Sequence, residues 1–265
     1  MSTIRKKILV PINFEQPGVY ALQHAVRVSN VVNESIVLVH VVKSDQEVDD
    51  AKTRLLEVAQ GVHQKYDFLP ETIVKVGDVA DAIADAASEM NASMVIMGSA
   101  SVKGKKDLSD LPTLKVITKS VVPFITIQEP PVNKRYDDII FPIDWTIENK
   151  EKHAWISYFC DYYVSKFHLV KPNIPDPEKL AKLDLNMASA VRYLDQKGAK
   201  YQIYTTPGIK PYAEEVLDLA VNIRADLIVI MTTRIPTDDS FIIEPHEQSI
   251  IGQAGHIPVM SINPI

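Results

Sequence analysis

The sequence is poor in the residues that several classes of protein require. It contains one cysteine, Cys160, which excludes an intramolecular disulfide framework and a zinc site built from paired cysteines. Nine glycines occur in 265 residues, and no segment matches the GxxxxGK[ST] pattern of a P-loop. No apolar run approaches the ~18 residues of a transmembrane helix. These absences favour a protein that resides in a reducing compartment and has no Walker-type phosphate loop.

Basic residues are also in deficit. The chain has 28 Lys and Arg against 34 Asp and Glu, a net charge of −6, which argues against binding to nucleic acid or to an anionic membrane. The opening MSTIRKKILVPI lacks the long apolar core and small-residue cleavage site of a signal peptide, so we interpret it as a first strand. We therefore expect a cytoplasmic protein. A hydrophobic fraction of 46% excludes a disordered chain.

An internal repeat divides the chain in two. Three segments recur with offsets of 131, 133 and 135 residues: Ile8–Phe14 with Ile139–Trp145, Ala92–Met97 with Ala225–Ile230, and Val122–Ile125 with Ile257–Met260. Such nearly constant spacing indicates a duplication. The joint, Glu129–Lys134, holds two prolines that favour an extended connector. We expect two domains, residues 1–130 and 135–265.

Each half alternates short apolar runs with longer segments of helical periodicity. The runs expected to be strands are Lys7–Pro11, Ser35–Val42, Thr72–Val76, Ser93–Met97 and Phe124–Ile127, then Asp138–Pro142, Lys166–Val170, Tyr201–Thr205, Leu227–Met231 and Val259–Ile262. Helical spacing occupies Gly18–Val32, Val48–Tyr66 and Val79–Met90, the last with Asp78 as its cap. Continuously apolar strands separated by helices predict an α/β fold, with doubly wound parallel sheets and right-handed crossovers.

Several of these segments resemble universal stress proteins. They are Val10–Phe14 with its copy Phe141–Trp145, Val76–Ile83, Ala92–Gly98, and the Val-Pro or Ile-Pro that precedes the last strand of each half. The resemblance covers essentially the whole chain. It implies two tandem domains, each a five-stranded parallel sheet of order 3-2-1-4-5 with helices on both faces. It also implies self-association, as a pseudo-dimer paired through Phe124–Gln128 and Val259–Ile262 and as a homodimer. Many members of the family bind ATP or AMP, and others do not.

The resemblance also implies where a nucleotide would lie. In open α/β sheets a ligand sits beyond the carboxyl ends of the strands, where the strand order reverses. The corresponding residues are Pro11, Ile12, Asn13, Val41, Gly98, Ser99 and Gly104 in the first half and Asp144 in the second. Gly98 has an alternative interpretation, because it could simply end a strand.

Neither half keeps the complete set found in ATP-binding members. These carry Asp at the end of strand one and glycines in the pattern G-x2-G-x9-G, followed by Ser or Thr, after strand four. The first half has Asn13 for the Asp, Ser101 for the second glycine and Asp110-Leu111 for the later pair. The second half keeps Asp144 but has no glycine in Met231–Pro236. Since glycine lets backbone amides approach a phosphate, we predict weak or absent ATP binding, confined to the first half.

Other residues are weaker candidates. The lysines at 103, 105 and 106 could attract phosphate, although such charge runs are usually solvated. His246 and His256 are expected to be structural rather than metal ligands, and we expect Cys160 to pack in the core. Trp145 could roof or plug the second site. We also hypothesise that Arg234 reaches Asp144 and occupies that site internally, with a solvated arginine as the alternative.

We therefore interpret the chain as a non-catalytic stress-response protein that binds a protein partner or a small ligand, with no certain cofactor. The alternative is a sensor that binds ATP or AMP at a relaxed site in the first half. A third class, an enzyme of the adenine-nucleotide α-hydrolase group, would need a phosphate loop such as SGGxDS after the first strand. Asn13–Gly18 is not such a loop.

Overall fold

The protein is described here from a computed structural model. It describes residues 6–100, 108, 111–120, 122–130, 132, 135–146, 152–235 and 241–264. The elements of the first half are β1 (Lys7–Pro11), α1 (Gln16–Val32), β2 (Ser35–Val42), a 3-10 turn (Asp45–Glu47), α2 (Val48–Tyr66), β3 (Glu71–Val76), α3 (Val79–Glu89), β4 (Ala92–Gly98), α4 (Pro112–Ile117) and β5 (Phe124–Ile127).

The second half repeats this order and adds a small hairpin. Its elements are β6 (Asp138–Pro142), α5 (Lys152–Tyr162), β7 (Lys166–Lys171), α6 (Pro177–Lys197), β8 (Lys200–Thr205), α7 (Tyr212–Ile223), β9 (Leu227–Met231), β10 (Thr233–Arg234), β11 (Phe241–Ile242), α8 (Pro245–Gln253) and β12 (Val259–Ile262). The sequence did not predict the antiparallel β10–β11 pair, whose strands have two residues each.

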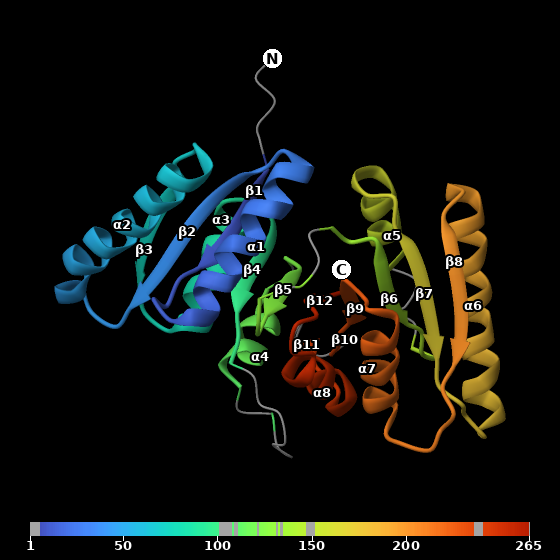
Figure 1. Cartoon of the computed structure of the whole chain (residues 1–265). Coiled ribbons are helices and arrows are strands. Elements are labelled where there is room, and N and C mark those ends of the chain that lie inside the picture. The colour runs from blue at the N-terminus through green and yellow to red at the C-terminus, as the bar shows by residue number, and fades with distance from the viewer. Residues whose placement is uncertain are drawn as a thin grey trace.

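The strand order in both halves is the expected one. The first half reads β3-β2-β1-β4-β5 and the second β8-β7-β6-β9-β12, all parallel within each half. The two sheets do not stay separate: β5 and β12 pair antiparallel, with Ile125 opposite Met260, to form one ten-stranded sheet. Figure 1 shows this pair in the middle of the molecule, with α2 and α6 toward opposite ends. The predicted contact through the fifth strands is therefore confirmed, and it removes both apolar edges from water.

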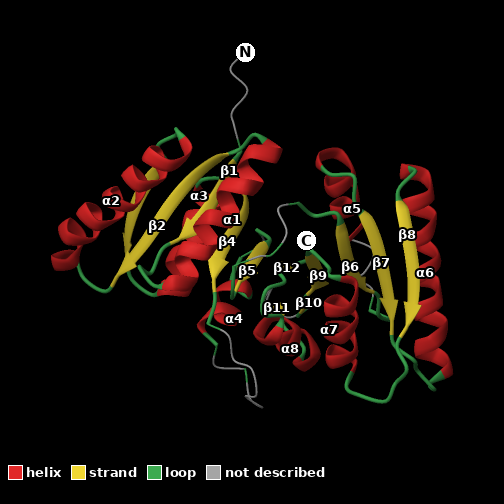
Figure 2. Ribbon diagram, viewed as in Figure 1, coloured by secondary structure: helices red, strands yellow, loops and turns green. Residues whose placement is uncertain are grey.

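Helices cover both faces of the sheet (Figure 2). Side chains of a strand alternate between faces, so Ile8 and Val10 belong to the core cluster that includes residues of α1, α2, α5 and α6. Leu9 belongs to the cluster on the other face, with residues of α3, α4, α7 and α8. Each of the two core clusters contains residues of both halves. The core is thus continuous across the duplication.

Local signals in the sequence explain several helix ends. The carboxylate of Asp78 accepts hydrogen bonds from the amides of Ala80 and Asp81, at 2.9 and 3.2 Å, which confirms it as the cap of α3. Helix α1 starts at Gln16, two residues before the expected start, because Pro17 suits a first helical turn.

Two buried amides tie the halves together at the ends of the central strands. Gln128, after β5, donates to the carbonyl oxygen of Ile251 at 3.0 Å and accepts from the amide of Gly255 at 2.9 Å. Asn263, after β12, donates to the carbonyl oxygens of Ile117 and Ser120 in the first half. Each half therefore receives hydrogen bonds from the other half's last strand.

Candidate functional site

A cavity of about 260 Å³ opens at the carboxyl ends of β1, β2 and β4. This is the point where the strand order reverses, because β1 lies between β2 and β4. Its described lining residues are Pro11, Ile12, Asn13, Glu15, Val39, His40, Val41, Val79, Ile83, Met97, Gly98, Ser99, Ala100, Leu111, Pro112, Thr113 and Val116. The cavity brings together every predicted first-half site residue except Gly104, which lies outside the described residues, as do the lysines at 103, 105 and 106.

The polar side chains at this cavity bond to one another. Asn13 accepts from the amide of Glu15 at 3.1 Å and donates to its carboxylate at 2.8 Å. The ring of His40 donates through Nδ1 to the carbonyl oxygen of Ile12 at 2.6 Å, which leaves Nε2 as the acceptor of the neutral ring. Ser99, which is buried, accepts a hydrogen bond from Thr113 at 2.9 Å. These hydrogen bonds fix the positions of the polar side chains that line the pocket.

The charge on the described residues of the cavity does not favour a polyphosphate. Among the described lining residues, Glu15 is the one permanently charged side chain, and its charge is negative. The remaining walls are largely apolar, with Val39, Val41 and Met97 among them. Such a surface suits a flat or apolar group better than a triphosphate.

Gly98 has a structural reason of its own. A Cβ at this position would lie 2.3 Å from the carbonyl carbon of Pro17 and 2.6 Å from the amide nitrogen of Gly18. The first turn of α1 thus packs directly on the end of β4. This contact requires glycine whether or not a phosphate binds, in agreement with the alternative interpretation given above.

The equivalent site of the second half is closed. It retains about 10 Å³, lined in part by Asp144, Met231 and His246. Tyr212, the first residue of α7, lines this remnant. The equivalent residue of the first half is Val79, the first residue of α3, which lines the open cavity. Burial raises the pKa of Tyr212 well above its usual value, so the hydroxyl stays protonated. Sequence reasoning missed this residue, although aligning the two halves would have paired Val79 with Tyr212.

Asp144 has a local role instead. Its carboxylate accepts from the amide and the hydroxyl of Thr146, at 2.7 and 2.5 Å. Asn186, on α6, donates to the carbonyl oxygens of both residues, at 2.9 and 2.7 Å. These bonds fix the turn that follows β6.

Arg234 and Trp145 were the two residues expected at the second site. Arg234 lies in β10 with an exposed side chain, and its contact with Asp144 stays a prediction. Trp145 is half-buried and packs on the core with Lys179 4.9 Å from its ring. The residue that closes the site is Tyr212.

Three further observations concern other classes of function. Cys160 is half-buried against the core, and burial raises the pKa of its thiol, which makes it a poor nucleophile. The described part of the chain contains no cluster of three or more His, Cys, Asp or Glu placed to hold a metal ion. Nor do its helices include one long and apolar enough to cross a bilayer.

This fold and site define a class: an α/β chain of two doubly wound halves with an open cavity at the switch point of the first. Residues 5–123 match the model of the Universal stress protein family, so the first half of the chain is a domain of that family. The family inferred from the sequence is therefore confirmed.

Solved structures extend the likeness over both halves. A universal stress protein from Archaeoglobus fulgidus DSM 4304 has a TM-score of 0.78 at 20% identity, covering 98% of this chain and 99% of its own. A functionally unknown protein from Pseudomonas aeruginosa PAO1 has a TM-score of 0.69 at 14% identity, covering 98% and 93%. At these identities the likeness is one of fold. The search of curated proteins returned no match to the sequence.

Proposed function

We propose that this universal stress protein is a non-catalytic, cytoplasmic binding protein with one working ligand site, in its N-terminal half. The ligand class is an adenine nucleoside or its monophosphate. The main support for this proposal is the difference between the two duplicated sites. One keeps a cavity of about 260 Å³, whereas the other, which Tyr212 lines, keeps about 10 Å³.

The chemistry of the cavity supports a nucleoside over ATP. The apolar side chains of Val39, Val41 and Met97 offer a surface for a planar base, and the unbonded Nε2 of His40 can accept a hydrogen bond. The negative charge of Glu15 opposes a polyphosphate. Each added phosphate should therefore contribute little to affinity or reduce it.

The same geometry supports a role without catalysis. Ser99 is buried and hydrogen-bonded to Thr113, while the His40 ring is committed to the carbonyl oxygen of Ile12. The hydroxyl and imidazole at this cavity therefore form no nucleophile–base pair of the kind that acyl-transfer enzymes use.

Calorimetric titration with adenosine, AMP and magnesium ATP tests the proposal. We expect adenosine and AMP to bind more tightly than ATP, and Val79→Tyr, which copies Tyr212 into the open site, to abolish binding. Val164→Tyr, at a site that is 85% exposed elsewhere, is the matched control and should bind as wild type does. Micromolar ATP binding that survives Val79→Tyr would overturn the proposal. If none of the three ligands binds, the interpretation given from the sequence remains, in which the protein binds a protein partner.

A further inference from the structure

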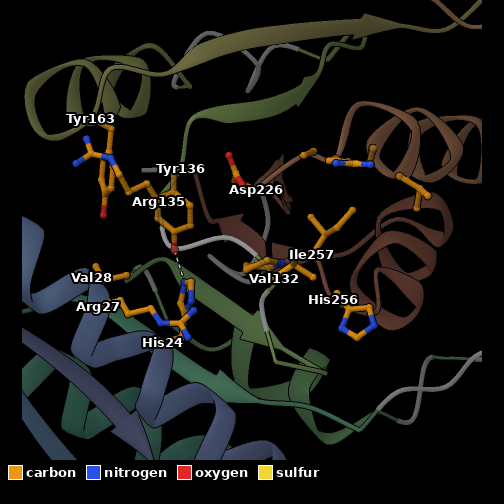
Figure 3. Close-up of a pocket in the computed structure, with 15 residues that line it drawn as sticks. His24, Arg27, Val28, Val132, Arg135, Tyr136, Tyr163, Asp226, His256 and Ile257 are labelled. Carbon is orange, nitrogen blue, oxygen red and sulfur yellow. Dashed lines mark hydrogen bonds between the residues drawn. The ribbon is translucent and has the colours of Figure 1, made fainter.

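A second and larger cavity, of about 370 Å³, lies at the seam between the two halves (Figure 3). One wall is α1 of the first half, which carries His24, Arg27 and Val28. The opposite wall belongs to the second half and includes Arg224 and Ile257. The cavity shares no lining residue with the site described above, so an inference about it is independent of the proposed function.

The described lining of this seam cavity is rich in positive charge. Three arginines, Arg27, Arg135 and Arg224, face it from three separate segments, against one carboxylate, Asp226. That carboxylate accepts hydrogen bonds from the amides of residues 137 and 138, both at 2.8 Å, so it serves the backbone that enters β6. The excess charge at the cavity is therefore cationic.

The guanidinium of Arg135 has capacity for a further acceptor. Arg135 lies 3.5 Å from the carboxylate of Asp137, and its guanidinium carbon is 5.8 Å from the centre of the Tyr163 ring. A guanidinium carries five N–H donors, so one such contact does not exhaust it. Arginine is also the side chain best suited to a planar carboxylate or a phosphoryl group.

A buried polar atom at the same cavity has no partner among the described residues. His24 is 5% exposed, and its Nε2 bonds to the hydroxyl of Tyr136 at 2.5 Å, as the dashed line in Figure 3 shows. Its Nδ1 has no hydrogen-bond partner. Burial, with Arg27 nearby, lowers the pKa of His24 to about 3, so the ring is neutral. A buried polar atom is usually satisfied in native proteins, and a ligand atom would satisfy this one.

The remaining walls of the cavity are partly apolar and indicate the body of the ligand. Val28 lines the cavity from the first half and Ile257 from the second, and Tyr136 lies beside His24 of α1 (Figure 3). The volume falls within the ~300–1,000 Å³ typical of small-molecule sites. We propose that the seam cavity binds a small organic anion: a compact apolar or aromatic body that carries one carboxylate or phosphoryl group.

Probes that separate the charge from the apolar body test this proposal. We expect phenyl phosphate and benzoate to bind the full chain, as followed by calorimetry and by the nitrogen resonances of the His24 ring. Benzyl alcohol, with the same body and no charge, should bind at least tenfold more weakly, as should inorganic phosphate alone. The ratio of phenyl phosphate to benzoate affinity identifies which oxyanion the site prefers.

Variants assign the binding to the cavity. Arg27→Gln and Arg224→Gln should each weaken phenyl phosphate at least tenfold, whereas Arg192→Gln, an exposed arginine on α6, should change nothing. If an arginine variant fails to fold, Val221→Trp replaces it in the test. This substitution narrows the cavity at a side chain that is 66% exposed, and it leaves the charges in place.

Val79→Tyr separates the two proposals. It closes the first-half pocket and should leave phenyl phosphate binding intact. Equal affinity for phenyl phosphate and benzyl alcohol, or binding that is insensitive to all these substitutions, would overturn the seam proposal. Absence of binding at millimolar phenyl phosphate would do the same.

Discussion

The hydroxyl of Tyr212 donates a 2.8 Å hydrogen bond to the carbonyl oxygen of Val170, the last buried residue of β7. This bond holds the ring across the second switch point. At the same place in the first half stands Val79, whose side chain is half exposed beside an open cavity. Tyr212 in place of Val79 is thus one difference between the copies that narrows the second site.

Replacing Tyr212 by Val should reopen the second site and destabilise the fold. Tyr212 is partly buried against the core, so removing its ring leaves a cavity, and such large-to-small changes cost about 2–5 kcal/mol. Tyr212→Phe keeps the ring, and the Val170 carbonyl still accepts from the amide of Ile143 at 2.8 Å, so this control should cost about 1 kcal/mol. Urea unfolding of both variants measures the difference. Equal costs would show that the ring does not fill the site.

Gly98→Ala should be strongly destabilising, for the steric reason found at the first turn of α1. Its Cβ would lie 2.3 Å from the carbonyl carbon of Pro17, a backbone atom that cannot rotate away. Overpacking of this kind costs about 1–3 kcal/mol or more. Gly61→Ala is the matched control, because α2 leaves open space around Gly61 and alanine should gain about 0.5–1 kcal/mol there. A silent Gly98→Ala in urea unfolding would contradict this packing.

Much of the fold could be predicted because its signals are local and repeated. Strands such as β1 and β9 are continuously apolar. The segments repeated at offsets of 131 to 135 residues showed which strand of the second half corresponds to each strand of the first. The first-half site followed from the same logic, since Asn13, Gly98 and Ser99 all end strands that meet at the switch point.

The closed second site and the seam were beyond the sequence, because both depend on tertiary contacts. Tyr212 starts a helix like any tyrosine, and its filling role arises only when α7 packs over β6 and β9. From the sequence alone, His24 looks like an ordinary polar residue on an amphipathic helix. Its burial follows from Tyr136, 112 residues away, and the first half alone would not supply that neighbour. The β10–β11 hairpin that carries Arg234 was missed for the same reason, because it gave no sequence signal.

Gln128→Leu should weaken the junction between the halves. The side chain makes two hydrogen bonds across the seam and is 6% exposed, so its loss leaves the Gly255 amide and the Ile251 carbonyl without this partner. Leaving buried polar groups unsatisfied costs about 1–3 kcal/mol. Gln60→Leu, at an exposed position of α2, should stay within about 0.5 kcal/mol in the same urea experiment. A Gln128 variant as stable as the control would mean that water replaces the amide.

The stability of the protein should fall in mild acid, with His24 as a main cause. The pKa of His24 is lowered to about 3 in the fold, chiefly by burial and also by Arg27, against 6.5 for an ordinary histidine. Between these values the unfolded chain binds one more proton than the native one. Stability contributed by neutral His24 is therefore complete above pH 6.5 and is lost as the pH falls toward 3. The expected slope is about 1 kcal/mol per pH unit below pH 6.

Comparison with His24→Gln isolates this contribution, because glutamine can keep a hydrogen bond to Tyr136 and does not titrate. Glu215, whose pKa is lowered to about 2 by backbone hydrogen bonds, adds a loss of stability only below about pH 4.5. Glu34, whose pKa is raised by burial, changes stability in the opposite direction as its carboxylate protonates. Both carboxylates are present in wild type and variant alike, so they cancel. Urea unfolding from pH 7.5 to 5 should show wild type losing about 2 kcal/mol more than His24→Gln. Parallel curves for the two proteins would mean that His24 is protonated, or exposed to water, in the native state.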